Sequence, residues 1–129
     1  MQEIFFVHDQ QESPEARKNF LEMTGFRVTL LKSGEECLER LEKARPALIL
    51  MEVLLKGPNG FEVCRHLRES HGPGALPIIL CSGIYRSRIY RDEALAAGAQ
   101  RYLLLPVDFE ELAEAVTDAL REARSASKT

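Results

Sequence analysis

Hydrophobic and polar positions follow two alternating patterns along this chain. Short apolar runs are separated by longer segments in which apolar residues recur every three or four positions. Continuous runs are typical of strands buried on both faces of a parallel sheet, and the longer spacing is typical of amphipathic helices. Residues 26–31 alternate instead, which favours a strand with one wetter face. The predicted strands are residues 3–9, 26–31, 47–52, 77–82 and 102–105.

The segments between these runs predict five helices. Ser13 and Pro14 are typical of a helix start, with Ser13 as the cap and Pro14 at the first helical position. This first helix is expected to end at Gly25. Its predicted apolar face consists of Ala16, Phe20 and Met23. The next three helices are predicted over residues 34–44, about 60–70 and about 86–97.

The last predicted helix has the clearest apolar stripe. Asp108 is its expected cap, and Glu111 follows three residues later, as in a capping box. The stripe consists of Phe109, Leu112, Ala113, Val116 and Leu120. Five strands that alternate with five helices predict a three-layer α/β domain with a parallel sheet. In such a fold the functional crevice lies at the carboxyl ends of the strands.

Composition narrows the possible functions. The 129 residues fit one domain, predicted over 1–124, with a flexible tail or linker at 125–129. A net charge of −3 excludes a generally basic nucleic-acid binder, and no apolar run reaches the length of a membrane span. Cys37, Cys64 and Cys81 are widely spaced, which favours reduced, buried thiols in a cytoplasmic protein. Cys81 lies beside Ser82, so a redox-sensing role is the alternative to inert packing.

Polar residues at strand ends and two characteristic segments make the chain resemble the receiver domain of two-component response regulators over residues 2–122. The segments are GFEVCRHLR at 60–68 and LPIILCS at 76–82. The resemblance implies a flavodoxin-like fold with strand order 2-1-3-4-5. In a working member, an aspartate after the third strand accepts a phosphoryl group from a histidine kinase. An acidic doublet holds Mg²⁺, a Ser or Thr contacts the phosphoryl oxygens, and a lysine pairs with them.

Several of these positions are changed in this sequence. The resemblance places Glu52 at the acceptor, His8 at the first acid of the doublet and Leu105 at the lysine. Asp9 and Ser82 match the pattern. Tyr102 matches an aromatic switch position, so the expected switch pair is Ser82 with Tyr102.

The substitutions predict a degenerate phosphorylation pocket. Glu extends about 1.5 Å further than Asp, and an error near 1 Å can cost about a hundredfold in rate. Losing the lysine removes electrostatic stabilisation of about several kcal/mol, and His8 removes an oxygen ligand that Mg²⁺ prefers. We therefore expect a pseudo-receiver that is not an enzyme. No cofactor is expected, and Mg²⁺ binding is expected to be weak or lost.

Alternative interpretations of these residues remain open. Glu52 could mimic a phosphorylated aspartate, or it could be an inert polar residue at a wet strand end. The chain could also be a working receiver with altered chemistry on Glu52. His8, Asp9 and Glu52 could form a metal- or small-ligand-sensing site, or an ordinary hydrogen-bonded group. Without their usual cations, Asp9 and Glu52 are expected to favour protonation of one carboxylate or charging of His8.

Arginine and tyrosine around the fourth predicted helix suggest a docking surface, since both residue types are enriched at interfaces. The alternative is a solvated helix face. The expected partners are signalling proteins, with a homodimer as one option and with neither nucleic acid nor membrane expected. The candidate docking residues are Tyr85, Arg86, Arg88, Tyr90 and Arg91.

Overall fold

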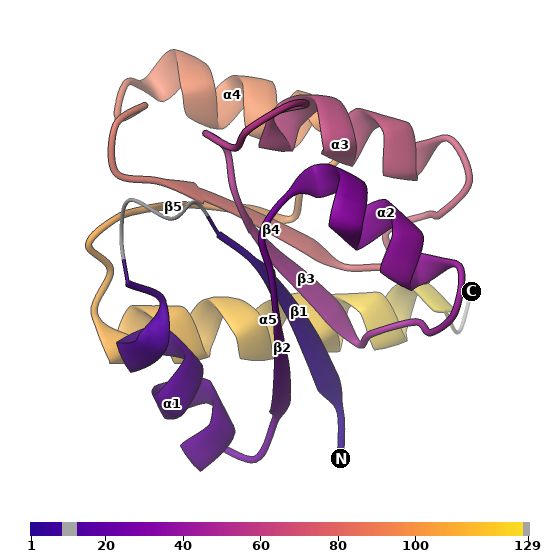
Figure 1. The fold of residues 1–129 in the computed structure, drawn as a ribbon, viewed down its shortest axis with the longest axis vertical. Coiled ribbons are helices and arrows are strands. Elements are labelled where there is room, and N and C mark those ends of the chain that lie inside the picture. Colours follow the sequence, from indigo (N-terminus) through magenta and orange to yellow (C-terminus); the bar gives the residue numbers. More distant parts are fainter. Residues whose placement is uncertain (9–12, 128–129) are drawn as a thin grey trace.

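A computed structural model describes residues 1–8 and 13–127 and shows a parallel sheet covered by helices on both faces (Figure 1). In this described part, five strands follow the order β2-β1-β3-β4-β5, which confirms the predicted fold class and strand order. The strands are β1 (Glu3–Val7), β2 (Arg27–Leu31), β3 (Leu48–Glu52), β4 (Ile78–Ser82) and β5 (Arg101–Leu104). The helices are α1 (Glu15–Met23), α2 (Gly34–Leu41), α3 (Gly60–Arg68), α4 (Arg88–Ala97) and α5 (Phe109–Ser127).

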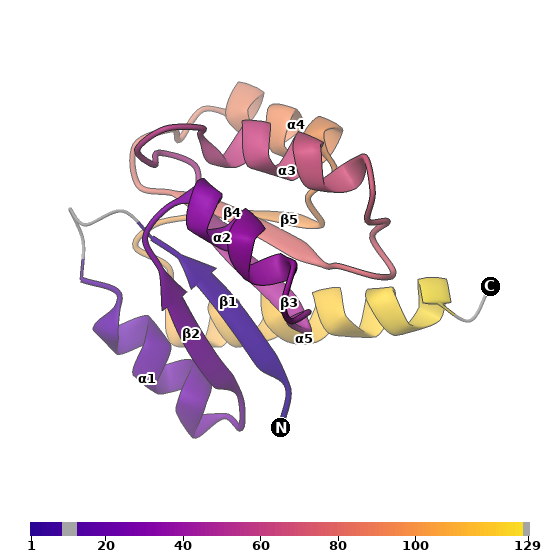
Figure 2. The ribbon, with the colours of Figure 1, turned by 45° about the vertical axis from the view of Figure 1, so that its right-hand side comes forward.

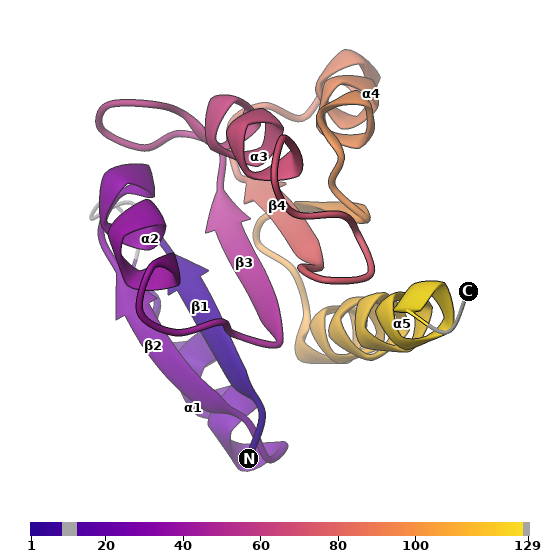
Figure 3. The same cartoon turned by 90° about the vertical axis from the view of Figure 1, so that its right-hand side faces the viewer.

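The two faces of the sheet carry separate apolar clusters. Helices α1 and α5 cover one face, and α2, α3 and α4 cover the other (Figures 2 and 3). Because side chains alternate along a strand, Leu48 and Leu50 of β3 join the cluster beneath α1 and α5, and Ile49 and Met51 join the opposite one. Glu52 continues this alternation, so its side chain faces the α1 and α5 layer.

Helix α1 is rotated relative to the predicted apolar face. Met23 is 86% exposed, whereas Leu21 is fully buried, so Met23 does not belong to the buried face. Arg17 and Leu21 are four residues apart and therefore share one side of the helix. The helix also starts one residue later than predicted, with Pro14 at the cap position and the Ser13 hydroxyl accepting a 3.4 Å bond from the Glu15 amide. The rotation turns Arg17 inward.

Caps fix where the later helices begin. Asn59 and Glu62 form a reciprocal capping box at the start of α3. The predicted cap of α5 is confirmed, since the Asp108 carboxylate accepts a 2.7 Å bond from the Glu111 amide. Helix α5 continues through Ser127, so residues 125–127 are helical. The domain boundary at 124 stays a prediction.

The cysteines have the predicted environment. Cys37, Cys64 and Cys81 are all buried free thiols. Burial raises the pKa of Cys37 from 9.0 to about 12 and that of Cys64 from 9.0 to about 11. Thiols that stay protonated at neutral pH are poor nucleophiles. Within residues 1–8 and 13–127, no helix has both the length and the apolar character needed to span a membrane.

Candidate functional site

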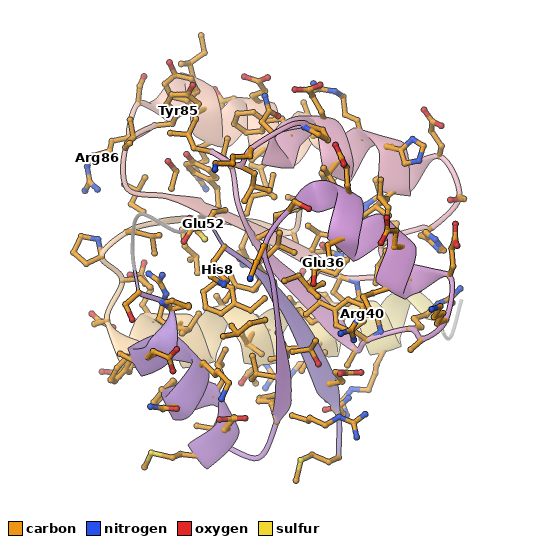
Figure 4. All side chains as sticks on the ribbon, viewed as in Figure 1. His8, Glu36, Arg40, Glu52, Tyr85 and Arg86 are labelled. Carbon is orange, nitrogen blue, oxygen red and sulfur yellow. The ribbon has the colours of Figure 1, made fainter. Side chains whose placement is uncertain are left out.

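The carboxyl ends of four strands bring together His8, Glu52, Ser82 and Leu105, which we call the strand-end site. Val7 pairs with Met51 across β1 and β3, so the residues that follow, His8 and Glu52, are neighbours (Figure 4). The exposed fractions are 9% for His8, 8% for Glu52, 4% for Ser82 and 3% for Leu105. The site therefore places polar groups and one apolar side chain in a largely dry environment.

Strand register also connects the other half of the site. Glu52 pairs with Cys81, and Ser82 pairs with Leu104. The Leu105 amide donates a 2.9 Å bond to the Ser82 carbonyl, which extends the β4–β5 ladder by one residue. The remaining predicted site residue, Asp9, lies outside the described residues.

Arg17 is a member of this site that sequence reasoning missed. Its Nη2 lies 3.5 Å from Glu52 Oε1, and the two side chains are only 13% and 10% exposed. Its guanidinium carbon lies 5.3 Å from the centre of the Phe6 ring. Glu52 thus has a cation that was not predicted, because the rotation of α1 brings a guanidinium to it. The only signal in the sequence was the i, i+4 spacing of Arg17 and Leu21.

Leu105 fills the position that the resemblance assigns to a lysine. It is buried in the same apolar cluster as Phe6, Cys81 and Leu103. The position therefore offers hydrocarbon in place of an ammonium group. Positive charge instead reaches Glu52 from α1, on a different side of the site.

Ser82 and Tyr102 both hold the loop between β4 and α4. The Ser82 hydroxyl accepts bonds from the Ile84 amide at 3.1 Å and the Tyr85 amide at 3.0 Å. The Tyr102 hydroxyl donates a 2.5 Å bond to the Tyr85 carbonyl. Burial raises the pKa of Tyr102, while hydrogen bonding with Ser82 acts in the opposite direction. The predicted switch pair is thus joined through one short loop, with the Tyr102 ring packed inward.

The candidate docking residues divide into two groups. Tyr85 and Tyr90 stack with ring centres 4.3 Å apart and pack against the core. The three arginines are exposed and line a groove of about 530 Å³. Tyr102, Leu104, Pro106 and Glu111 are also among the lining residues. Arg86 is held at the rim, since it donates a 2.7 Å bond to the Leu105 carbonyl. The surface between α4, β5 and α5 is therefore basic along α4 and includes apolar positions on β5.

The three-residue metal hypothesis is not tested by the structure. No group of three His, Cys, Asp or Glu side chains suitable for a metal occurs in the described ranges, but Asp9 lies outside them. The hypothesis therefore stays a prediction for His8, Asp9 and Glu52.

Comparison with known proteins gives the family. The model for the response regulator receiver domain matches residues 4–117. The phosphate regulon transcriptional regulatory protein PhoB of Rhizobium meliloti is 32% identical over 121 residues, covering 94% of this chain and 53% of PhoB. The transcriptional regulatory protein PcoR of Escherichia coli is 30% identical, covering 100% of this chain and 56% of PcoR. The chain thus spans about half the length of these relatives.

Solved structures agree with this match. A CheY-like response regulator receiver domain protein from Methanospirillum hungatei superposes with a TM-score of 0.86 and 26% identity, covering 98% of each chain. The receiver domain of sensor histidine kinase PA1611 from Pseudomonas aeruginosa has a TM-score of 0.80 and 28% identity, covering 92% of this chain and 97% of that chain. That structure has magnesium coordinated in its active site cleft. With its sheet order, its strand-end site and a family match over most of its length, the chain belongs to the response regulator receiver domain family.

Proposed function

We propose that this receiver domain is a pseudo-receiver, which signals through protein–protein contacts without phosphorylation at Glu52. The observation that carries the proposal is the environment of that carboxylate. Arg17 pairs with Glu52 from α1, and Leu105 occupies the lysine position with a buried apolar side chain. Arg17 engages one oxygen of the carboxylate, and an apolar residue cannot stabilise the charge of a transferred phosphoryl group.

The neighbouring hydroxyls support a fixed state of the switch. Ser82 already accepts two loop amides, and Tyr102 is bonded to the same loop. These bonds fix the Ser82 hydroxyl oxygen against the loop. We therefore favour Glu52 as a fixed charge that helps hold α1 against the sheet, and not as a group that takes part in chemistry.

The proposed partners are signalling proteins that bind the groove between α4 and β5. Its exposed arginines suit a partner segment with acidic and apolar side chains. The proposed setting is the cytoplasm, where reduced thiols persist. A working receiver with altered chemistry on Glu52 is the competing function, favoured by the burial of Ser82 next to the β3 end.

Intact-mass measurement after incubation with acetyl phosphate and MgCl₂ separates these two functions. We expect no added phosphoryl group, which would appear as a gain of about 80 Da. The matched control is the Glu52→Gln variant, and a phosphorylatable receiver treated in parallel shows that the reagent is active. A stable adduct on the native chain that is absent from Glu52→Gln would overturn the proposal.

A further inference from the structure

The ion pair between Arg17 and Glu52 connects α1 to the end of β3, across 35 positions of sequence. Both side chains are close to nine-tenths buried, at 13% and 10% exposure. Water is largely excluded there, so the attraction between the two charges is stronger than on the surface. Removing one partner of such a pair leaves a poorly solvated charge, which is far more costly than losing a surface ion pair. The pair is therefore a constraint on the position of α1.

The guanidinium is held by more than this pair. It lies above the ring of Phe6, at 5.3 Å from the ring centre, and Phe6 itself is fully buried. His8 meets the same ring edge-on, with ring centres 5.9 Å apart. A planar guanidinium can stack flat on an aromatic ring while its N–H groups bind a carboxylate, whereas an ammonium group is a compact point charge without a flat face. Leu21, one turn further along α1, is fully buried and fixes the phase of the helix.

The Arg17 guanidinium occupies the place beside Glu52 that a magnesium ion would need. Mg²⁺ binds oxygen ligands at about 2.0–2.1 Å, usually one or two carboxylates together with several waters. Around the Glu52 carboxylate the described residues instead offer the Arg17 guanidinium, which has no lone pair to give, the His8 imidazole and the hydrocarbon of Leu105. A cation that bound Glu52 would have to displace the guanidinium against its contacts with Phe6.

We propose that Arg17 is the resident cation of the strand-end site and makes the site independent of divalent metal. The guanidinium supplies from α1 the positive charge that magnesium supplies in metal-binding receivers. The proposal deepens the proposed function, on which it rests, because it identifies the group that occupies the Glu52 carboxylate. It also makes Glu52 and Arg17 a functional unit that is separate from Ser82 and Tyr102.

Thermal unfolding with and without magnesium tests this role. The native chain, Arg17→Gln, Arg17→Lys, Glu52→Gln and the double variant Arg17→Gln/Glu52→Gln are melted in millimolar MgCl₂ and in NaCl of equal ionic strength. The native Tm is expected to be the same in both salts. Arg17→Gln is expected to melt a few degrees lower in NaCl and to recover part of that loss in MgCl₂, because a bound ion stabilises the folded state by mass action. Both variants that carry Glu52→Gln are expected to show no magnesium response.

The comparison of MgCl₂ with NaCl remains informative even where a variant folds poorly. Arg17→Lys keeps the charge and loses the stacking, so we expect a smaller loss of Tm and no magnesium response. If Arg17→Gln is unfolded in NaCl, folding in MgCl₂ supports the proposal, and failure in both salts overturns it. A native Tm that rises in MgCl₂ as much as that of Arg17→Gln also overturns it. A phosphoryl adduct on Glu52 with no magnesium response would instead overturn only the proposed function.

Discussion

A single hydroxyl group joins β5 to the loop that precedes α4. The Tyr102 hydroxyl donates to the Tyr85 carbonyl, and the Tyr85 amide donates in turn to the Ser82 hydroxyl. These bonds connect the ends of β4 and β5 through side chains that are at least partly buried. At the scale of residues, the conformation of this loop therefore depends on the Tyr102 hydroxyl and on the inward orientation of its ring.

The Tyr102→Phe variant is expected to lose about 1 kcal/mol of unfolding free energy, the usual net contribution of a neutral hydrogen bond. Urea unfolding measures this change. Tyr90→Phe is the matched control, since the Tyr90 hydroxyl has no hydrogen bond within the part of the chain that the structure describes. Equal losses in the two variants would contradict a specific role for the Tyr102 hydroxyl.

Buried thiols give the domain a predicted sensitivity to alkali. Folding raises the pKa of Cys37 to about 12 and of Cys64 to about 11, from 9.0. Well below pH 9 the thiols are protonated in both the folded and the unfolded chain, so their contribution to the free energy of unfolding is fully present. As pH rises further, the unfolded chain ionises first, so stability falls until the folded pKa is passed. The loss is expected to be on the order of 1 kcal/mol per thiol near pH 10.

Urea unfolding at about pH 8 and about pH 10 checks this dependence. The Cys37→Ala variant removes one of the two thiols, so its stability should fall less between the two pH values. The comparison uses the difference between pH values within each variant, which cancels the cost of the smaller side chain. An identical fall in the native and Cys37→Ala proteins would count against the thiol as the cause.

Sequence alone predicted most of the residues at the strand-end site. His8, Glu52, Ser82 and Leu105 follow apolar runs, and a parallel sheet brings the ends of such runs together. Arg17 escaped prediction because α1 has only nine residues. In so short a helix, the sequence pattern is compatible with more than one side facing the sheet. The charged Arg17 was therefore not assigned to the buried side. The cation therefore became visible only when tertiary packing had fixed the rotation of the helix.

At the scale of elements, Arg68 joins the carboxyl end of α3 to the end of α4 and the start of β4. It donates to the Gly98 carbonyl at 2.9 Å, the His71 carbonyl at 3.1 Å and the Leu76 carbonyl at 2.7 Å. It also donates to Gln100, whose side-chain oxygen accepts the Ile78 amide. One guanidinium thus satisfies carbonyl groups that belong to several elements.

Replacing Arg68 with Ala is expected to reduce the free energy of unfolding by about 2–4 kcal/mol, because several partly buried acceptors lose their donor at once. Chemical denaturation measures the change. The matched control is Arg65→Ala on the same helix, whose pairing with Glu93 is solvent-exposed, at 52% and 45%. That substitution should cost less than about 0.5 kcal/mol. Similar losses in both variants would show that helix propensity, and not the network, is responsible.

Element boundaries were predictable where caps are explicit and less so elsewhere. The Asp108 cap and the start of α3 at Gly60 agree with the pattern in the sequence. The end of α5 was missed, since Ser-Ala-Ser looks like a frayed end although a long apolar stripe keeps the helix against the sheet. Ala123 of that stripe is 7% exposed.

At the scale of the whole molecule, the groove between α4 and β5 is the described surface best suited to a partner. Arg88 and Arg91 are exposed, and neither takes part in an ion pair within residues 1–8 and 13–127. Exposed apolar side chains lie on the same elements, with Leu95 at 43% and Leu104 at 37%. Charged side chains that are not yet paired can contribute to association without first breaking internal bonds.

Charge reversal of Arg88 and Arg91 together is expected to abolish capture of the partner from the native cell extract. Reversal of Arg40, on α2 (Figure 4), and Arg45, between α2 and β3, is the matched control, since it makes the same change in net charge outside α4. Both variants should keep the native Tm, because all four side chains are exposed. Equal capture by the native protein and the Arg88/Arg91 variant would contradict docking at this groove.

The position of Arg17 also limits the order in which substitutions could restore a phosphorylation site. A lysine introduced at Leu105 would be buried within the apolar layer that contains Phe6, over which the guanidinium already lies. Two cations would then lie close to Glu52 in a dry environment, so the lysine is unfavourable while Arg17 remains. After Arg17 is lost, the same lysine becomes favourable. The effect of Leu105→Lys on stability therefore has opposite signs with and without Arg17. This is sign epistasis between α1 and the end of β5, the strand at the edge of the sheet.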